Sequence, residues 1–197
     1  AEVAHEHHRR HGASLRDRLF AEVETVSALG SALAPLSNWL PRLPGTRRAL
    51  EATLGIARER ELPRFHRRTF ADWFAARGPG VPEAEAGRRV LLYADTYTDY
   101  NHPAAGKAAV RLLEAAGVHV RLAPVEDSGR PPLSKGFVER ARATARENVE
   151  ALAPRLADGW DLVSVEPTDA VMFQADYADL LSGEDVETVR GRSFGLC

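Results

Sequence analysis

Three short segments of the chain are rich in side chains that could bind a ligand or a metal ion. They are residues 95–103, which read Asp-Thr-Tyr-Thr-Asp-Tyr-Asn-His-Pro, residues 124–132, which read Pro-Val-Glu-Asp-Ser-Gly-Arg-Pro-Pro, and residues 166–169, which read Glu-Pro-Thr-Asp. Four of their carboxylates, those of Asp95, Asp127, Glu166 and Asp169, would repel one another if they met unpaired. We therefore expect that arginines or a cation neutralise them, since oxygen ligands of this kind suit Mg²⁺, Ca²⁺ or an amine.

Each polar segment follows an apolar run that reads as a β-strand. Residues 90–94 are a continuous apolar run, as expected for a strand covered on both faces, and residues 162–165, Leu-Val-Ser-Val, predict a further strand. Between them Val118, Val120 and Leu122 alternate with His119 and Arg121, which predicts a half-buried strand with His119 on its exposed face. The polar segments then lie at the carboxyl ends of the strands, where open α/β sheets bind their ligands.

A helix pattern follows each strand. The first helix covers residues 103–116 and is closed by Gly117, the second begins with Ser134 as its N-cap, and the third is capped by Thr168 and extends to Leu181. Three successive strand–helix units predict an α/β fold with a parallel sheet, Rossmann-like and three-layered, with right-handed crossovers. The apolar positions expected in its core are Val138, Ala141, Ala145, Val149, Leu152, Met172, Phe173 and Tyr177.

The first 87 residues carry no strand pattern and read as a helical extension. We expect helices over residues 1–11, 14–33, 46–54 and 70–76, and the apolar segment 36–44 should lie against something. Residues 78–82, Gly-Pro-Gly-Val-Pro, are typical of a linker. We therefore divide the chain into a helical extension with its linker, residues 1–87, and an α/β domain, residues 88–197. The stripe expected on the second helix consists of Leu15, Leu19, Val23, Val26 and Leu29.

Composition excludes several classes of protein. The 26 basic and 28 acidic residues provide no bulk positive charge for nucleic-acid binding, and no run approaches the roughly 18 apolar residues of a spanning helix. The single cysteine, Cys197, excludes a disulfide framework and favours the reducing cytoplasm. Phosphate-loop, dinucleotide-binding and Gly-x-Ser-x-Gly patterns are absent, which argues against a free-standing hydrolase. Because both ends look cut, we expect a fragment of a longer protein.

The polar segments carry a family resemblance. Tyr-Asn-His-Pro at residues 100–103, Ser-Gly-Arg-Pro at 128–131, Ser-Lys-Gly at 134–136 and Glu-Pro at 166–167 follow one another between strands and helices. Over residues 89–181 this order resembles the cysteine-rich domain of FAD-linked oxidases, the iron–sulfur subunits of glycolate oxidase, archaeal-type D-lactate dehydrogenase and anaerobic glycerol-3-phosphate dehydrogenase. It is also similar to the cysteine-rich subunit of heterodisulfide reductase. In that family the three loops contain Cys-Tyr before Asn-Tyr-Asn, Cys-Cys-Gly-Arg-Pro and Glu-Pro-Ser-Cys.

The cysteines of that family are replaced in this chain. The resemblance places Thr96, Asp127, Ser128 and Asp169 at the positions of the cluster ligands. Iron–sulfur clusters need soft thiolate ligands, occasionally histidine, so we expect no cluster and no other cofactor in this chain. The resemblance implies FAD and iron–sulfur clusters for the parent protein. The further members of the candidate ligand rim are Asp95, Tyr97, Tyr100, Asn101, His102, Glu126, Arg130, Lys135 and Glu166.

Two weaker signals each have a plainer structural alternative. His7 and His11 are four residues apart and could ligate a metal ion, but no third ligand is evident, and a solvated helix is the alternative. Lys135 and Arg130 could meet an anion at the helix N-terminus opened by Ser134, or they could form salt bridges with the rim carboxylates.

The sequence favours a cluster-free structural or docking module of an FAD- and iron–sulfur-linked oxidoreductase, of the 2-hydroxyacid or glycerol-3-phosphate dehydrogenase type, that serves electron transfer. Catalysis would then lie elsewhere in the parent. The expected partners are other domains or subunits of a flavin-dependent dehydrogenase in the cytoplasm, with no nucleic acid, and an indirect membrane association of the parent complex stays open. The alternative is an independent binding module whose acidic rim takes a cation or a small ligand.

Overall fold

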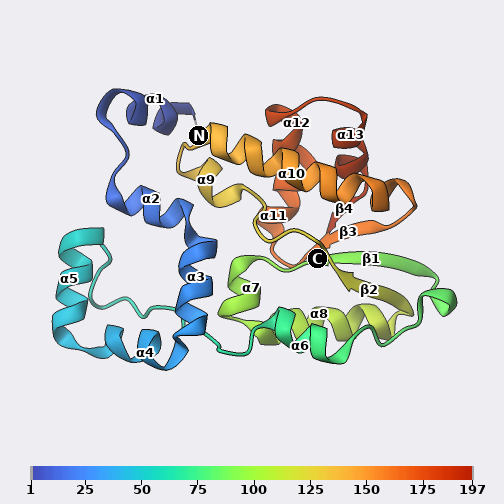
Figure 1. Ribbon diagram of the computed structural model, residues 1–197, viewed down its shortest axis with the longest axis horizontal. Coiled ribbons are helices and arrows are strands. Elements are labelled where there is room, and N and C mark those ends of the chain that lie inside the picture. The colour runs from blue at the N-terminus through green and yellow to red at the C-terminus, as the bar shows by residue number, and fades with distance from the viewer. Residues whose placement is uncertain (1, 197) are drawn as a thin grey trace.

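The computed structural model describes residues 2–196, and its centre is a four-stranded sheet in the order β2-β1-β3-β4 (Figure 1). All three strand pairings are parallel, and Leu91 of β1 lies opposite Arg121 of β2 and Leu162 of β3. The predicted α/β class with a parallel sheet is confirmed. The strands are β1 (Arg88–Tyr93), β2 (Val118–Leu122), β3 (Asp161–Ser164) and β4 (Ser193–Gly195), of which only β4 was not expected.

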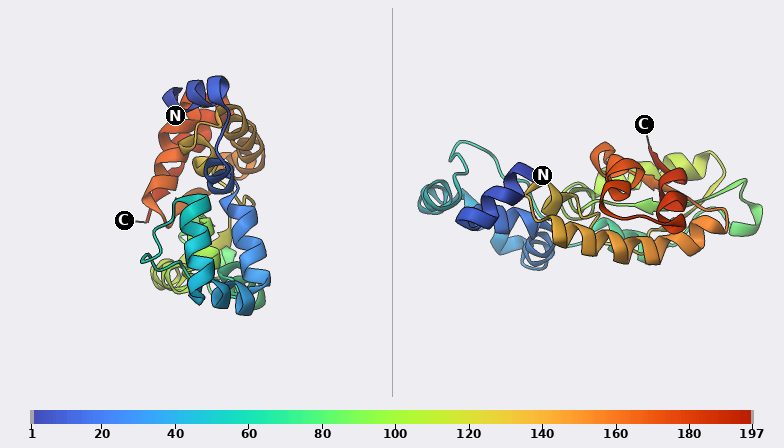
Figure 2. Two further views of the ribbon diagram at one scale, coloured as in Figure 1. Left: turned by 90° about the vertical axis from the view of Figure 1, so that its left-hand side faces the viewer. Right: turned by 90° about the horizontal axis from the view of Figure 1, so that it is seen from above.

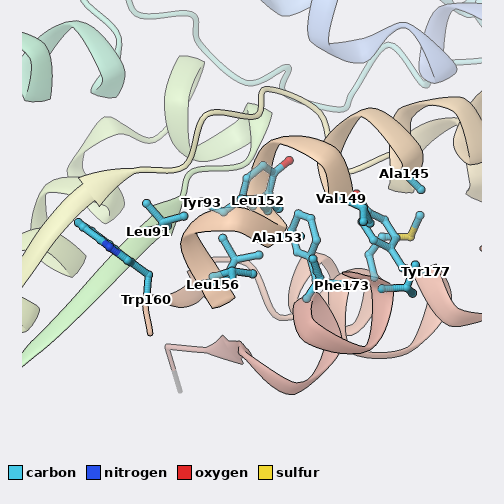
Figure 3. Packing of buried hydrophobic residues seen from close by; sticks show 14 residues of the cluster. Leu91, Tyr93, Ala145, Val149, Leu152, Ala153, Leu156, Trp160, Phe173 and Tyr177 are labelled. Carbon is cyan, nitrogen blue, oxygen red and sulfur yellow. The ribbon is translucent and has the colours of Figure 1, made fainter. Parts of the chain in front are cut away.

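Helices cover both faces of the sheet, which gives the expected three layers. On one face, Leu91 and Leu162 pack against α10 and the chain around Phe173, as Figure 3 shows for part of this cluster. On the other face, Val90 and Val120 pack against α6 and α8. The helices of this region are α6 (Phe70–Arg77), α7 (Thr96–Tyr100), α8 (Pro103–Ala115), α9 (Arg130–Ser134), α10 (Val138–Ala157), α11 (Pro167–Val171), the π-helical turn η3 (Met172–Asp176), α12 (Tyr177–Leu180) and α13 (Glu184–Gly191).

The predicted core positions are confirmed with one exception. Val138 is only half-buried, because it opens α10 at the rim of the fold. The others are buried: Ala141, Ala145, Val149, Leu152, Met172, Phe173 and Tyr177.

Three expectations about individual residues are wrong. Ser134 ends the short helix α9 rather than capping α10, which begins after Phe137. Thr168 lies in the first turn of α11, and Glu166 is the N-cap that accepts its backbone N–H. His119 is buried, because its Nδ1 lies 2.7 Å from the carbonyl oxygen of Val81 and its ring packs edge-on against Trp160.

The extension is helical, as expected, but its second helix is divided. At Glu22 the backbone leaves helical geometry, with φ −101° and ψ 24°, so that the predicted helix over 14–33 becomes α2 and α3. Both pack on the sheet-containing part of the chain, α2 against α9 and α3 against α7, and the boundary after residue 87 stays a prediction. The elements are α1 (Glu2–His11), α2 (Leu15–Ala21), α3 (Val23–Ala32), α4 (Ala34–Trp39), η1 (Leu40–Arg42), α5 (Pro44–Leu54) and η2 (Glu83–Glu85).

Several apolar residues of the extension are exposed, although the segment 36–44 was expected to pack against another part of the structure. The stripe of α2 and α3 is exposed at Leu15, Leu19, Val26 and Leu29, and in the segment 36–44 Leu36, Trp39 and Leu40 are exposed as well. The described chain leaves between 36% and 61% of each of these side chains exposed. Among residues 2–196, no helix is long and apolar enough to cross a membrane.

Candidate functional site

The three polar segments converge on one pocket beyond the carboxyl ends of β1, β2 and β3. The pocket has a volume of about 230 Å³. All four residues at the cluster-ligand positions line it: Thr96, Asp127, Ser128 and Asp169. Asp95, Tyr97, Asn101 and Arg130 of the predicted rim line it too. Predicted positions separated by up to 74 residues in sequence therefore form one site, as the parallel topology requires.

Helix α3 of the extension forms one wall of this pocket. Val23 and Ser27 line it, and the Thr96 hydroxyl donates a hydrogen bond to the carboxylate of Glu24. Burial is the main cause that raises the pKa of Glu24, and the hydrogen bond from Thr96 opposes this rise. Sequence reasoning did not find Glu24 or Ser27, because nothing local in the extension indicates contact with a loop about 70 residues away.

Asp95 is used as a helix cap. Its Oδ1 accepts the backbone N–H groups of Tyr97 at 2.9 Å and Thr98 at 3.0 Å, and its Oδ2 accepts the Thr98 hydroxyl. The carboxylate thereby satisfies two N–H groups of the first turn of α7, and the three hydrogen bonds compensate its burial. The charge at Asp95 therefore has a structural partner within its own loop.

Ser128 and Asp169 form a direct hydrogen bond between two cluster-ligand positions. The Ser128 hydroxyl donates to Oδ1 of Asp169 at 2.5 Å, and its oxygen accepts the backbone N–H of Arg130 at 3.2 Å. Asp169 is buried, which raises its pKa to about 6; the Ser128 hydrogen bond opposes this rise, and neighbouring carboxylates add to it. This hydrogen bond therefore joins the polar segment 124–132 to the polar segment 166–169.

Two buried side chains, those of Asn148 and Tyr177, hold the polar segment 124–132 in place. Nδ2 of Asn148 donates to the carbonyl oxygen of Asp127 and to the hydroxyl of Tyr177, each at 2.7 Å. The Tyr177 hydroxyl in turn donates to the carbonyl oxygen of Ser128 at 2.9 Å. Tyr177 was expected only to pack, and Asn148 was not singled out, because a polar residue on a helix gives no sign of which loop it meets.

The carboxylates of the rim are not neutralised by arginine. Arg130 pairs with Asp176 of η3 at 3.0 Å, and none of the residues described here forms an ion pair with Asp95, Asp127 or Asp169. Asp127 instead accepts the backbone N–H of Gly129 at 2.8 Å, and burial raises its pKa. Hydrogen bonds therefore take the place of arginine partners at Asp95, Asp127 and Asp169, and burial raises the pKa of the last two.

The remaining predicted residues lie outside this pocket. Tyr100 and Glu126 line a second pocket of about 550 Å³ beside Glu24, and burial is the first cause that raises the pKa of Tyr100. His102 is exposed, with its ring 4.8 Å from that of Tyr97. Glu166 caps α11.

The possible anion site at Ser134 has no helix N-terminus, because no helix begins there, and neither Arg130 nor Lys135 forms the alternative salt bridge with a rim carboxylate within the described residues. The ammonium group of Lys135 lies 4.0 Å from the Asp17 carboxylate and above the ring of Phe20. It therefore contacts α2 of the extension instead of an acidic loop.

The donor set does not fit an iron–sulfur cluster. Two hydroxyls and two carboxylates stand at the ligand positions, all hard oxygen donors, and each already has a hydrogen-bond partner within the protein. Within residues 2–196, no group of three or more His, Cys, Asp or Glu side chains is arranged to hold a metal ion. The exposed rings of His7 and His11 lie 4.8 Å apart without a third ligand in that range.

Comparison with known proteins relates the chain to two dehydrogenases. One subunit of the anaerobic glycerol-3-phosphate dehydrogenase of Escherichia coli is 28% identical over 171 residues, which cover 86% of this chain and 43% of that protein. D-2-hydroxyglutarate dehydrogenase of Escherichia coli is 25% identical over 225 residues, which cover 97% of this chain and 22% of that protein. D-2-hydroxyglutarate dehydrogenase of Haemophilus influenzae is 24% identical over 190 residues, which cover 92% of this chain and 18% of that protein.

No protein-family model matches the chain, and no solved structure matches it. The chain spans less than half the length of the curated relatives named above. Their names confirm the resemblance to the glycerol-3-phosphate and 2-hydroxyacid dehydrogenase families, and they relate this chain to oxidoreductases.

Proposed function

We propose, from its relationship to these dehydrogenases, that this chain is a cluster-free structural or docking module of an FAD- and iron–sulfur-linked oxidoreductase. The parent would oxidise a 2-hydroxyacid or glycerol 3-phosphate, with its FAD, its clusters and its catalytic residues outside this chain. The module would contact other domains or subunits of that dehydrogenase in the cytoplasm, with any membrane association indirect. No nucleic acid is involved.

The observation that carries the proposal is the hydrogen bonding at the four cluster-ligand positions. In the related family these positions would present thiolates to iron, whereas here they bind one another and the protein around them. The 2.5 Å bond from Ser128 to Asp169 joins two of the positions directly, and Thr96 is engaged by Glu24 of the extension. A site filled in this way supports a role in holding loops together rather than in transferring electrons.

The first prediction concerns iron. The purified chain, incubated anaerobically with ferrous iron and sulfide, should remain colourless and contain no stoichiometric iron, because carboxylates and hydroxyls do not replace the four thiolates of a cluster. The measurements are metal analysis and visible absorption. The matched control is a variant with Thr96→Cys, Asp127→Cys, Ser128→Cys and Asp169→Cys, which should gain iron and colour.

Stoichiometric iron with a charge-transfer band in the unaltered chain would overturn the cluster-free role. The alternative, an acidic rim that binds a cation or small ligand, is tested by calorimetric titration with Mg²⁺, Ca²⁺ and small hydroxyacids. Binding heat that Asp169→Asn and Asp127→Asn abolish would favour that alternative, and a docking module should give none.

A further inference from the structure

The part of the extension between residues 34 and 68, here called the arm, has almost no core of its own. Within the arm only Ala34 is buried, and α5 and η1 contain no buried residue. In Figures 1 and 2 α4 and α5 lie at the end of the molecule away from the sheet. Short helices without tertiary burial are marginal in water, so the arm needs either internal hydrogen bonds or a cover.

Hydrogen bonds give the arm its shape. Asn38 makes two bonds to the backbone of Phe65, donating to its carbonyl oxygen at 2.8 Å and accepting its N–H at 2.9 Å. The Ser31 hydroxyl donates to the carbonyl oxygen of His66, and Arg47 donates to that of Pro41 at 2.6 Å. These bonds hold residues 64–68 beside α3 and α4, where the half-buried Phe65 ring packs against Gly30, but no residue of this segment is fully buried.

An apolar surface is left uncovered where α3 meets α4. Its members, here called the arm surface, are Leu29, Leu33, Leu36 and Trp39, with exposed fractions of 61%, 57%, 50% and 53%. Leu29 lies in the last turn of α3, Leu33 is the junction residue, and Leu36 and Trp39 are three residues apart on α4, a spacing that places two side chains on one helix face. Large apolar side chains exposed on two neighbouring helices are typical of interaction sites.

The charge of the arm indicates what kind of partner the arm surface would take. The arm holds eight arginines and three glutamates, although the whole chain has 26 basic and 28 acidic residues, so that 18 basic and 25 acidic residues remain elsewhere. Of the eight arginines, only Arg58 forms an ion pair with another residue in the described part of the chain. The near balance of total charge therefore conceals a basic arm on an acidic body.

A second copy joined arm to arm would bring two basic surfaces together, which is unfavourable. We propose that the arm surface docks an acidic amphipathic helix of a partner protein, whose apolar side covers Leu29, Leu33, Leu36 and Trp39 and whose carboxylates meet the arginines of the arm. The inference deepens the docking role proposed above and rests on it only for the choice of a protein as partner.

The test uses the full chain and two synthetic helical peptides with leucine at the a and d heptad positions, one with glutamate at all other positions and one with lysine. Trp39 is the exposed tryptophan, so binding of the acidic peptide should shift tryptophan emission to shorter wavelength. The lysine peptide should not bind, and added salt should weaken the acidic complex. The iron measurement above does not depend on this result, so the two proposals can fail separately.

Variants locate the binding site. The double substitution Leu33→Ser with Leu36→Ser, and separately Arg42→Glu with Arg48→Glu, should each weaken binding about tenfold or more, because they remove contacts at the centre of the interface or reverse its charge. The matched controls on α8 are Leu112→Ser, which is as exposed as the arm leucines, and Arg111→Glu. Both controls should bind the peptide like the unaltered chain.

Four outcomes overturn the proposal. They are a failure of the acidic peptide to bind, equal binding of both peptides, and a dimer in sedimentation that the leucine substitutions dissociate. The fourth is binding to vesicles of anionic lipid that the same leucine substitutions abolish, which would assign the arm surface to a membrane.

Discussion

Asp169 combines burial with a position at the centre of the loop network, so its ionisation affects both stability and site geometry. The carboxyl has a raised pKa of about 6 and one strong donor, the Ser128 hydroxyl. A neutral carboxyl at this position removes charge from a pocket that already contains Asp95 and Asp127. At the residue scale, protonation below about pH 6 therefore removes one negative charge from a pocket in which no arginine of the described chain pairs with a carboxylate.

The corresponding prediction concerns stability between pH 4 and 7. Unfolded Asp169 has an ordinary pKa near 3.9, so between about pH 4 and pH 6 the folded chain binds more protons at this residue than the unfolded chain does. Its contribution to the free energy of unfolding must then fall as the pH rises through this window. Asp169→Asn should remove that fall and be more stable than the unaltered chain at pH 7.5, by up to about 3 kcal/mol.

The measurement is urea unfolding of both proteins at pH 4.5 and pH 7.5. Asp179→Asn is the control, because Asp179 is an exposed carboxylate of the same region and should leave the pH dependence unchanged. An equal loss of stability in the Asp169→Asn variant on raising the pH would show that this carboxyl is not responsible.

At the scale of elements, the junction of α6 with α8 depends on a close approach at Gly106. Phe70 begins α6, is fully buried, and lies so near Gly106 that a Cβ there would be 2.7 Å from the phenyl ring. A capping box between Thr69 and Asp72 fixes the start of α6 at this point. Helix α6 is therefore positioned by the contact of the Phe70 ring with the backbone of α8 at Gly106, where no side chain intervenes.

Gly106→Val should destabilise the fold by about 1–3 kcal/mol, because the added methyl groups displace the Phe70 ring and overpack the core. Chemical denaturation measures the change. Ala105→Val, at an exposed position on the same helix, adds valine without the clash; it costs roughly 0.5 kcal/mol in helix propensity, whereas Gly106→Val gains a few tenths, so propensity alone would make the Gly106 variant the more stable of the two. If both variants lose the same stability, the contact with Phe70 is not the cause.

At the scale of the whole molecule, stability is expected to differ sharply between the arm and the α/β region. Residues 35–69 contain no buried residue, whereas α10 alone buries seven. Regions with few buried contacts open locally at low free energy and are cut first by proteases. The arm also contains eight arginines, which are cleavage sites for trypsin.

Limited digestion with trypsin should therefore cut first within residues 42–68 and leave a fragment that contains β1 to β4. Mass spectrometry of the early products identifies the sites. The internal reference is Arg155, an exposed arginine on α10, which should be cut much later. Early cleavage at Arg155 would show that the α/β region is no more stable than the arm.

The sequence by itself determined the parallel α/β class, three of the four strands and the convergence of the polar loops. The reason is that local patterns indicate these features: apolar runs mark the strands, helical spacing marks the helices, and a polar segment follows each of the three predicted strands. The proximity of the four positions equivalent to cluster ligands could also be predicted from the sequence, because the loops that contain them follow parallel strands whose carboxyl ends meet at one edge of the sheet.

Only the tertiary structure decided what these residues contact. The bond between Ser128 and Asp169, the pairing of Arg130 with Asp176 and the approach of Glu24 to Thr96 join residues 41 to 72 positions apart. No local pattern specifies such partners, since they follow from the packing of α3 and η3 against the loops. The burial of His119 has the same origin, because the residues that cover it come from outside its strand.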